Sequence, residues 1–206
     1  FSITTDWSGV PEPPLAGDDA YDTIGNTRLE VRNVPSAGGP KVVVVGDVMD
    51  NDIDEDAGAT LTVTAASGTT SKGGTFSILG DGTFTYEPEA GDVHGTGTED
   101  SFTYTLSDGT FNVLGTVRIK TTARVWYVKN DAPLAAPASD DGTSVDPFDT
   151  LAAAQTASQP DDYIFVYFGD GTNTGYNVGI VLKSGQHLIG EHAGLSIPVN
   201  LNGNGS

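Results

Sequence analysis

The stretch TFSILGDGTFTYEP, residues 75–88, decides the fold class of this chain. Two short segments of alternating apolar and polar residues flank Asp81-Gly82, a pair that favours a tight hairpin turn because glycine adopts positive φ angles at little cost. Phe84 and Tyr86 are two positions apart and would therefore lie on the same face of a strand. The stretch predicts a β-hairpin with a buried aromatic face.

Similar short segments, separated by Gly, Asp and Asn, surround this hairpin from Asp18 to about Thr122 and are typical of an all-β sandwich. The expected strands are residues 20–24, 28–31, 42–46, 60–65, 74–79, 83–87, 100–107 and 112–121. The residues expected in the core or in cross-strand pairs, rather than in a ligand-stacking platform, are Phe76, Phe84, Tyr86, Phe102 and Tyr104. We therefore expect a Greek-key β-sandwich over residues 18–122.

Residues 1–17 end in PEPPLAG, whose prolines fix φ and lack an N–H donor. This composition predicts a stiff, extended leader or linker. Trp7 is the exception in this segment, and we expect it to pack onto a neighbouring domain or subunit.

Residues 123–206 have a different character. RVWYVKN (124–130) predicts a strand, and PFDTLAAAQTAS (147–158) predicts a short helix with Pro147 near its first turn and Pro160 closing it. DYIFVYFGDGT (162–172) is so continuously apolar that its strand should be covered on both faces, and GIVLKSGQHLIGE (179–191) predicts strand, turn and strand. We interpret this part as the beginning of a right-handed parallel β-helix with a short capping helix.

The charge of the chain excludes several classes of function. There are 28 Asp and Glu against 9 Lys and Arg, a formal net charge of -19, so binding of nucleic acid is not expected. No apolar run has the length of a membrane span, and we expect no membrane insertion by this segment. The chain has no cysteine, which removes disulfides and thiolate-bound metals. Such acidity suits a protein that binds Ca²⁺ or remains soluble in salt.

The acidic run DNDIDED, residues 50–56, contains aspartates at alternate positions. In an extended loop, Asp50, Asp52, Asp54 and Asp56 would point to one side and repel one another. Ca²⁺ accepts six to eight oxygen ligands in irregular geometry and would relieve that repulsion. The run lacks the glycine and the distal glutamate of an EF-hand, and its alternative interpretation is a solvated acidic loop with Asx-turns.

Four stretches resemble, in order and spacing, the bacterial cadherin-like, immunoglobulin-type repeats of large surface adhesins: DDAY (18–21), GDVMDNDIDEDAGATLTVT (46–64), GGTFSILGDGTFTYEP (73–88) and DSFTYTLSDG (100–109). This resemblance implies a secreted or cell-surface location and calcium at the same aspartates, with Asp19 or Asp18 and Asp100 as completing ligands. Residues 126–191 look like the start of the pectate-lyase-like parallel β-helices that follow such repeats, without a catalytic motif.

The function expected from these features is that of a structural or adhesive module, rigidified by Ca²⁺, in a larger bacterial adhesin or extracellular assembly. Its expected partners are other copies or neighbouring domains of the same surface protein. The first alternative is a fragment of an exoprotein that binds or degrades polysaccharide along a β-helix, and the second is a subunit of an extracellular filament.

We do not expect an enzyme, because no pair of carboxylates has a spacing that fixes a cleavage site. The acids and histidines that the polysaccharide alternative would use are Asp146, Asp149, Asp161, Asp162, Asp170, Glu191, His187 and His192. Turn chemistry accounts for most of these acids, and we interpret both histidines as surface residues.

Overall fold

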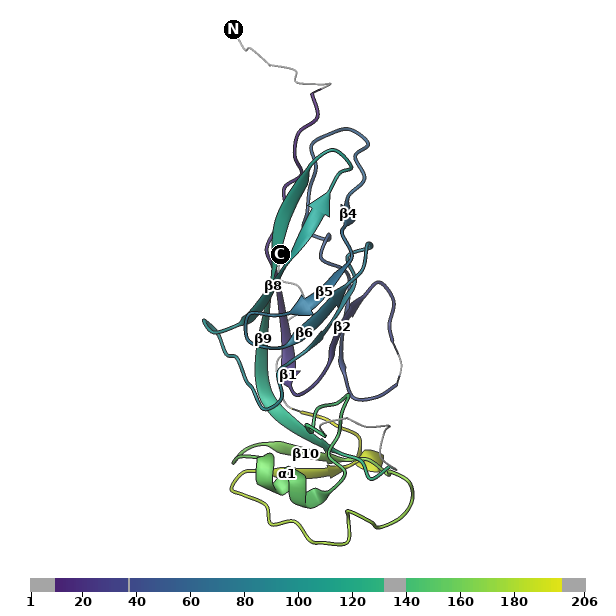
Figure 1. The fold of residues 1–206 in the computed structure, drawn as a ribbon, viewed down its shortest axis with the longest axis vertical. Helices are drawn as coiled ribbons and strands as arrows, with labels where there is room; N and C mark the ends of the chain where they lie inside the picture. Colours follow the sequence, from purple (N-terminus) through teal and green to yellow (C-terminus); the bar gives the residue numbers. More distant parts are fainter. Residues whose placement is uncertain (1–9, 37, 132–139, 198–206) are drawn as a thin grey trace.

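The computed structural model describes residues 10–36, 38–131 and 140–197 and contains two β-sheets (Figure 1). One sheet has the order β11-β10-β9-β8-β4, with β1 paired to β9, and the other has the order β3-β2-β7-β6-β5. The strands are β1 (Asp19–Gly25), β2 (Leu29–Arg32), β3 (Val42–Val45), β4 (Thr62–Val63), β5 (Ala66–Thr69), β6 (Thr75–Ile78), β7 (Phe84–Glu87), β8 (Asp100–Ser107), β9 (Asn112–Val128), β10 (Tyr163–Val166) and β11 (His187–Gly190). The helices are α1 (Leu151–Ala157) and the 3₁₀ turn η1 (Glu191–Ala193).

The two sheets pack face to face around one apolar core, as expected for a sandwich. Alternation along β7 and β8 puts every second side chain into this core, as their burial patterns show. The Phe84 ring contacts Tyr21 and Phe102 edge-on, with centroids 5.2 and 5.3 Å away, and Phe76 stacks on Phe102 at 4.1 Å. The prediction that the aromatic residues belong to the core is confirmed.

Two local expectations differ from the structure. Strand β5 was not expected, because its sequence ASGT has no apolar alternation and is exposed throughout; it forms by antiparallel pairing with β6. The loop between β6 and β7 comprises residues 79–83, and the Leu79 N–H donates to the Thr83 carbonyl at 2.9 Å, which encloses the three residues 80–82. Of Asp81 and Gly82, only Gly82 has a positive φ, 76°, whereas the two-residue turn we expected needs that conformation at both positions.

Strand β9 continues through position 122, where we expected the sandwich to end. Its first half is antiparallel to β8, its middle is parallel to β1, and its last four residues are parallel to β10. Ala123 has φ 59°, and the pairing with β1 shifts register between Thr23 and Gly25, which marks a β-bulge. The chain therefore passes from the sandwich into the C-terminal sheet without a linker.

The last residues of β9 with β10 and β11 form the parallel end of the six-stranded sheet, called the C-terminal sheet below, and the hairpin of β8 and β9 extends toward the other end of the molecule (Figure 1). Strand β10 pairs in register with both neighbours, so that Trp126, Ile164 and Leu188 form one column. Helix α1 covers the face of Trp126 and Ile164, while Phe165 lies in the cluster on the other face. Coverage of β10 on both faces, expected from its apolar sequence, is confirmed.

The helix and the last predicted strands differ in detail from the expectation. Helix α1 starts after Thr150, whose hydroxyl accepts the Ala153 N–H at 3.2 Å, and Pro147 lies three residues before this cap. Residues 179–186 form no strand, contrary to the prediction of a strand before the turn; here the Lys183 ammonium donates to the carbonyl groups of Gln155 and Ser158 at the end of α1. Among the described residues, no helix has the length and apolar character needed to cross a membrane.

Candidate metal centre

The first half of the acidic run is a turn, whereas we expected an extended loop with all four aspartates on one side. The Asp52 N–H donates to the Met49 carbonyl at 3.2 Å, and the Asp50 carboxylate accepts the N–H of Asp47 at 3.2 Å. Asp47 in turn accepts the Met49 N–H at 2.8 Å. Asp50 is therefore an exposed turn residue and does not share one side of the loop with the later aspartates.

Asp52 is buried between the leading segment, residues 10–17, and strand β8. Its carboxylate accepts the Gly17 N–H at 2.8 Å and the Tyr104 hydroxyl at 3.1 Å. The Tyr104 hydroxyl also lies within hydrogen-bonding reach of Asp19, which is fully buried. Burial, together with Asp19 and Asp52, raises the pKa of Tyr104, so its hydroxyl stays protonated and donates.

Three carboxylates come together at a second position. Oxygens of Asp54, Asp56 and Asp108 lie within 4.8 Å of one another, and all three side chains are half-buried. We call these residues the aspartate trio. Asp54 and Asp56 were predicted as ligands, whereas Asp108 was not, because it lies in the distant loop between β8 and β9. Its only sequence signal is the Asp-Gly turn that closes the stretch DSFTYTLSDG.

Backbone N–H groups hold two members of the trio in place. Asp108 Oδ1 accepts the N–H groups of Thr110 and Phe111, each at 2.6 Å. The Phe111 N–H is the main cause of the lowered pKa of Asp108, which keeps that carboxylate ionised. Asp54 Oδ1 accepts the Asp56 N–H at 2.7 Å. By contrast, Asp54 Oδ2 is buried and has no hydrogen-bond partner in the described structure.

The leading segment is tied to the same loop. Leu15 and Ile53 exchange two backbone hydrogen bonds, at 2.8 and 3.1 Å, and the Glu12 N–H donates to Asp56 Oδ2 at 3.0 Å. Gly17 permits this approach, because a Cβ there would lie 2.8 Å from Asn51 Nδ2. The trio thus joins the leading segment, the acidic run and the tip of the β8–β9 hairpin.

Asp100, expected as a completing ligand, serves a separate polar network. Its fully buried carboxylate accepts hydrogen bonds from the hydroxyl groups of Thr70, Ser71 and Tyr86 and from the N–H groups of Lys72 and Ser101. Burial alone would raise the pKa of Asp100, but these donors outweigh burial and lower it. All its neighbours are donors, so the carboxylate is satisfied within the fold.

The trio suits a hard cation by its chemistry. All of its side-chain donors are oxygens, the atoms that Ca²⁺ prefers, and three carboxylates this close repel one another without a counter-charge. A cation at this place would also satisfy Asp54 Oδ2. The residues present therefore fit calcium, with its remaining positions open to water.

Asp52 lies outside the trio and has a raised pKa. Burial, with a further contribution from Asp47, raises the pKa of Asp52 against the lowering hydrogen bonds from Gly17 and Tyr104. Because the raised pKa makes the ionised carboxylate less favourable in the folded protein than in the unfolded chain, we expect Asp52→Asn at pH 7 and without metal to raise the free energy of unfolding or to change it by less than about 1 kcal/mol. Urea unfolding in EDTA measures this, and a large loss would show that the charge of Asp52 is needed.

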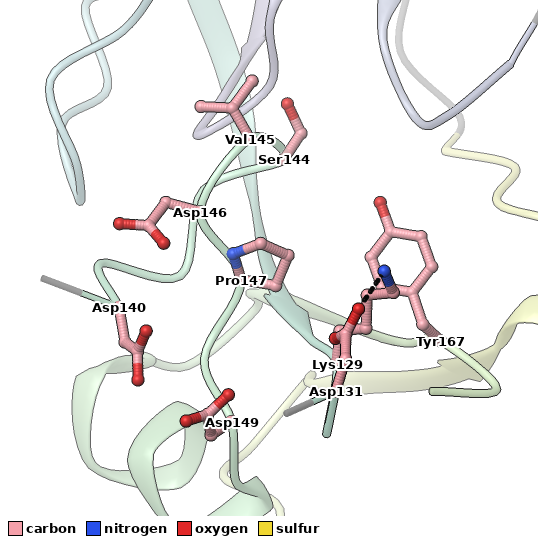
Figure 2. Close-up of a pocket in the computed structure, with 9 residues that line it drawn as sticks. All are labelled: Lys129, Asp131, Asp140, Ser144, Val145, Asp146, Pro147, Asp149 and Tyr167. Atoms are coloured by element: carbon pink, nitrogen blue, oxygen red, sulfur yellow. Dashed lines mark ion pairs between the residues drawn. The ribbon is translucent and has the colours of Figure 1, made fainter. Parts of the chain in front are cut away.

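A small acidic pocket of about 180 Å³ lies in the C-terminal part. Figure 2 shows the carboxylates of Asp140, Asp146 and Asp149 along one side of it, and the ion pair of Lys129 with Asp131 on the other. Burial and the neighbouring carboxylates raise the pKa of Asp146 and of Asp149. Of the acids considered for polysaccharide chemistry, this pocket brings together only these two within the described structure.

Other residues considered for polysaccharide chemistry contact neighbouring residues of the fold. Asp162 is buried and paired with Arg124, Asp170 accepts the Thr172 N–H in a turn, and Glu191 accepts the Phe168 N–H. His187 stacks on the Tyr163 ring at 4.9 Å, and His192 lies 6.1 Å from the Phe168 ring. Trp7 lies outside the described residues.

Comparison with known proteins agrees with the sandwich. The model of the bacterial cadherin-like domain family matches residues 11–123, which include the leading segment from Pro11, the acidic run and the β8–β9 hairpin. No curated protein matches the chain. Because the matched residues make up more than half of the 206, this chain belongs to the bacterial cadherin-like domain family.

Proposed function

We propose that the chain is a stiff, non-catalytic module of a secreted or cell-surface bacterial protein, and that Ca²⁺ bound at the aspartate trio rigidifies it. A cadherin-like domain is an extracellular, adhesive type of module. The calcium part of the proposal rests on one observation: Asp54 Oδ2 is a buried carboxylate oxygen without a hydrogen-bond partner, inside a cluster of three carboxylates.

The position of the trio explains how an ion would stiffen the module. Its members come from the acidic run and the hairpin tip, and Asp56 also holds the Glu12 N–H of the leading segment. An ion bound to all three carboxylates would restrict these chain segments relative to one another. The leading segment would then leave the sandwich in a fixed direction, which suits a module arranged in series with neighbouring domains or copies.

The C-terminal sheet supports a further part of the proposal. Tyr163 pairs with His187 in register, and β9, β10 and β11 are all parallel. Successive parallel strands in register are what the first coils of a parallel β-helix require. We infer that the sandwich precedes such a β-helix in an extracellular assembly or filament. The polysaccharide alternative would use the pocket of Asp146 and Asp149 (Figure 2).

Thermal unfolding with Ca²⁺ and with EDTA tests the calcium site. At a free Ca²⁺ concentration a hundred times Kd, one site adds about 2.7 kcal/mol, or a rise in Tm of roughly 5–10 °C for a chain of this size. Asp108→Asn should remove most of this rise, because it deletes one charge of the trio.

Asp81→Asn is the matched control, because Asp81 also lies in a hairpin loop, accepts the Thr83 N–H and has a lowered pKa caused first by the Thr83 hydroxyl. This control should keep the full calcium response. A wild-type Tm that is the same in Ca²⁺ and EDTA would rule out the site.

A further inference from the structure

The junction between the sandwich and the C-terminal sheet contains a buried ion pair. Both oxygens of Asp162, at the start of β10, lie 3.1 Å from Arg124 Nε on β9, and Arg124 Nη2 is 3.0 Å from Oδ2. Asp162 is 5% exposed. Its carboxylate also accepts the Trp126 indole N–H at 2.9 Å and the Gln159 N–H at 2.6 Å. A single carboxylate thus holds β9 to the turn that follows α1.

Arg124 continues this connection into the sandwich. Its Nη1 donates to the carbonyl of Gly91, in the loop between β7 and β8, and its guanidinium lies 5.6 Å from the centre of the Trp126 ring. Gly91 packs against that ring, since a Cβ there would lie 3.5 Å from Trp126 Cη2. Arg124 therefore contacts both structural parts at once.

A second set of contacts lies beside this ion pair. The hydroxyl groups of Thr27 and Tyr127 are 2.8 Å apart in a buried position, and Ser144 N–H donates to the Asn26 carbonyl at 2.8 Å. Ile24 of the sandwich packs with Tyr127 and Phe165 in one apolar cluster. Because β9 is continuous here, no linker separates the two parts along this strand.

We propose that Arg124 and Asp162 form a clamp that makes the sandwich and the C-terminal sheet one rigid, cooperatively unfolding body without any metal. Two separate features then make the molecule rigid. At the end where the leading segment enters, the proposed calcium would supply the counter-charge to the trio, whereas the Arg124 guanidinium supplies it to Asp162 at the other end. The clamp does not depend on whether the trio binds calcium.

Distance measurements between two labels test the clamp. Wild type contains no cysteine, so Ser77→Cys on β6 and Ala152→Cys on α1, both exposed, introduce two spin-label sites without interference. We expect one narrow distance distribution, the same in Ca²⁺ and in EDTA. Arg124→Met should broaden it, and calorimetry of that variant should lose the single unfolding transition of wild type as the C-terminal sheet melts first.

Arg118→Met is the matched control, because Arg118 lies on the same strand and its ion pair, 3.5 Å from Asp18, is exposed. It should leave the distribution narrow. If Arg124→Met does not fold, Asp162→Asn tests the same ion pair with less disturbance of packing. A broad distribution in wild type, broadening by EDTA alone, or a narrow distribution in both clamp variants would overturn the proposal.

Discussion

Replacing Asp100 with alanine is expected to lower the free energy of unfolding by about 3–5 kcal/mol. The carboxylate is fully buried and accepts hydrogen bonds from five donor groups, two of them backbone N–H groups that cannot turn toward water. Alanine removes the acceptor of the Thr70 and Tyr86 hydroxyl groups and of the Lys72 N–H, whereas the Ser101 N–H keeps the Ser71 hydroxyl as a second acceptor. Asp100→Asn should restore part of the loss, because the amide oxygen can still accept the N–H groups of Lys72 and Ser101.

Urea unfolding at pH 7 measures the loss, with Asp170→Ala as the control, since Asp170 is exposed and accepts the Thr172 N–H in a turn. The effect should also depend on pH. The pKa of Asp100 is lower in the folded protein than in the unfolded chain, so its stabilising contribution is complete above about pH 4 and is lost as the pH falls through the folded value. Equal acid sensitivity of wild type and Asp100→Ala would contradict this.

Leu106→Ala is expected to cost about 2–5 kcal/mol, because Leu106 is fully buried in the sandwich core and its removal leaves a cavity between the sheets. Leu114→Ala is an internal comparison: Leu114 lies on the partner strand β9 and is 70% exposed, so its change should stay within about 0.5 kcal/mol. Chemical denaturation of both variants gives the difference, and losses of similar size would mean that the sheets do not pack as described.

The sandwich was predictable because its core residues occupy alternate positions within single strands. Phe102, Tyr104 and Leu106 follow one another at a spacing of two, and that pattern is local. Strand β5 was not predicted, because its four exposed residues show no such pattern. Its extended conformation comes from pairing with β6. The path of β9 across the expected boundary also depends on partners distant in sequence, β1 and β10.

The candidate metal centre was predictable only in part, for the same reason. Asp54 and Asp56 belong to the acidic run, whose composition identifies it directly. Asp108 comes close to them because β4, the strand after the acidic run, pairs with β8 and places Thr62 opposite Ser107; residue spacing does not encode this long-range pairing. Alternate side chains point to one side only in an extended loop. The Met49–Asp52 turn instead places the Asp50 carboxylate where it accepts the Asp47 N–H.

The parallel pairing of β1 with β9 has a mechanical consequence. Tension that enters before Asp19 and leaves after Arg124 pulls these two neighbouring strands in opposite directions along their length. The hydrogen bonds between them are then loaded in shear, so they share the force and must break together, instead of opening one at a time as in an unzipping hairpin. A chain of such modules would therefore transmit a pull through the β1–β9 seam.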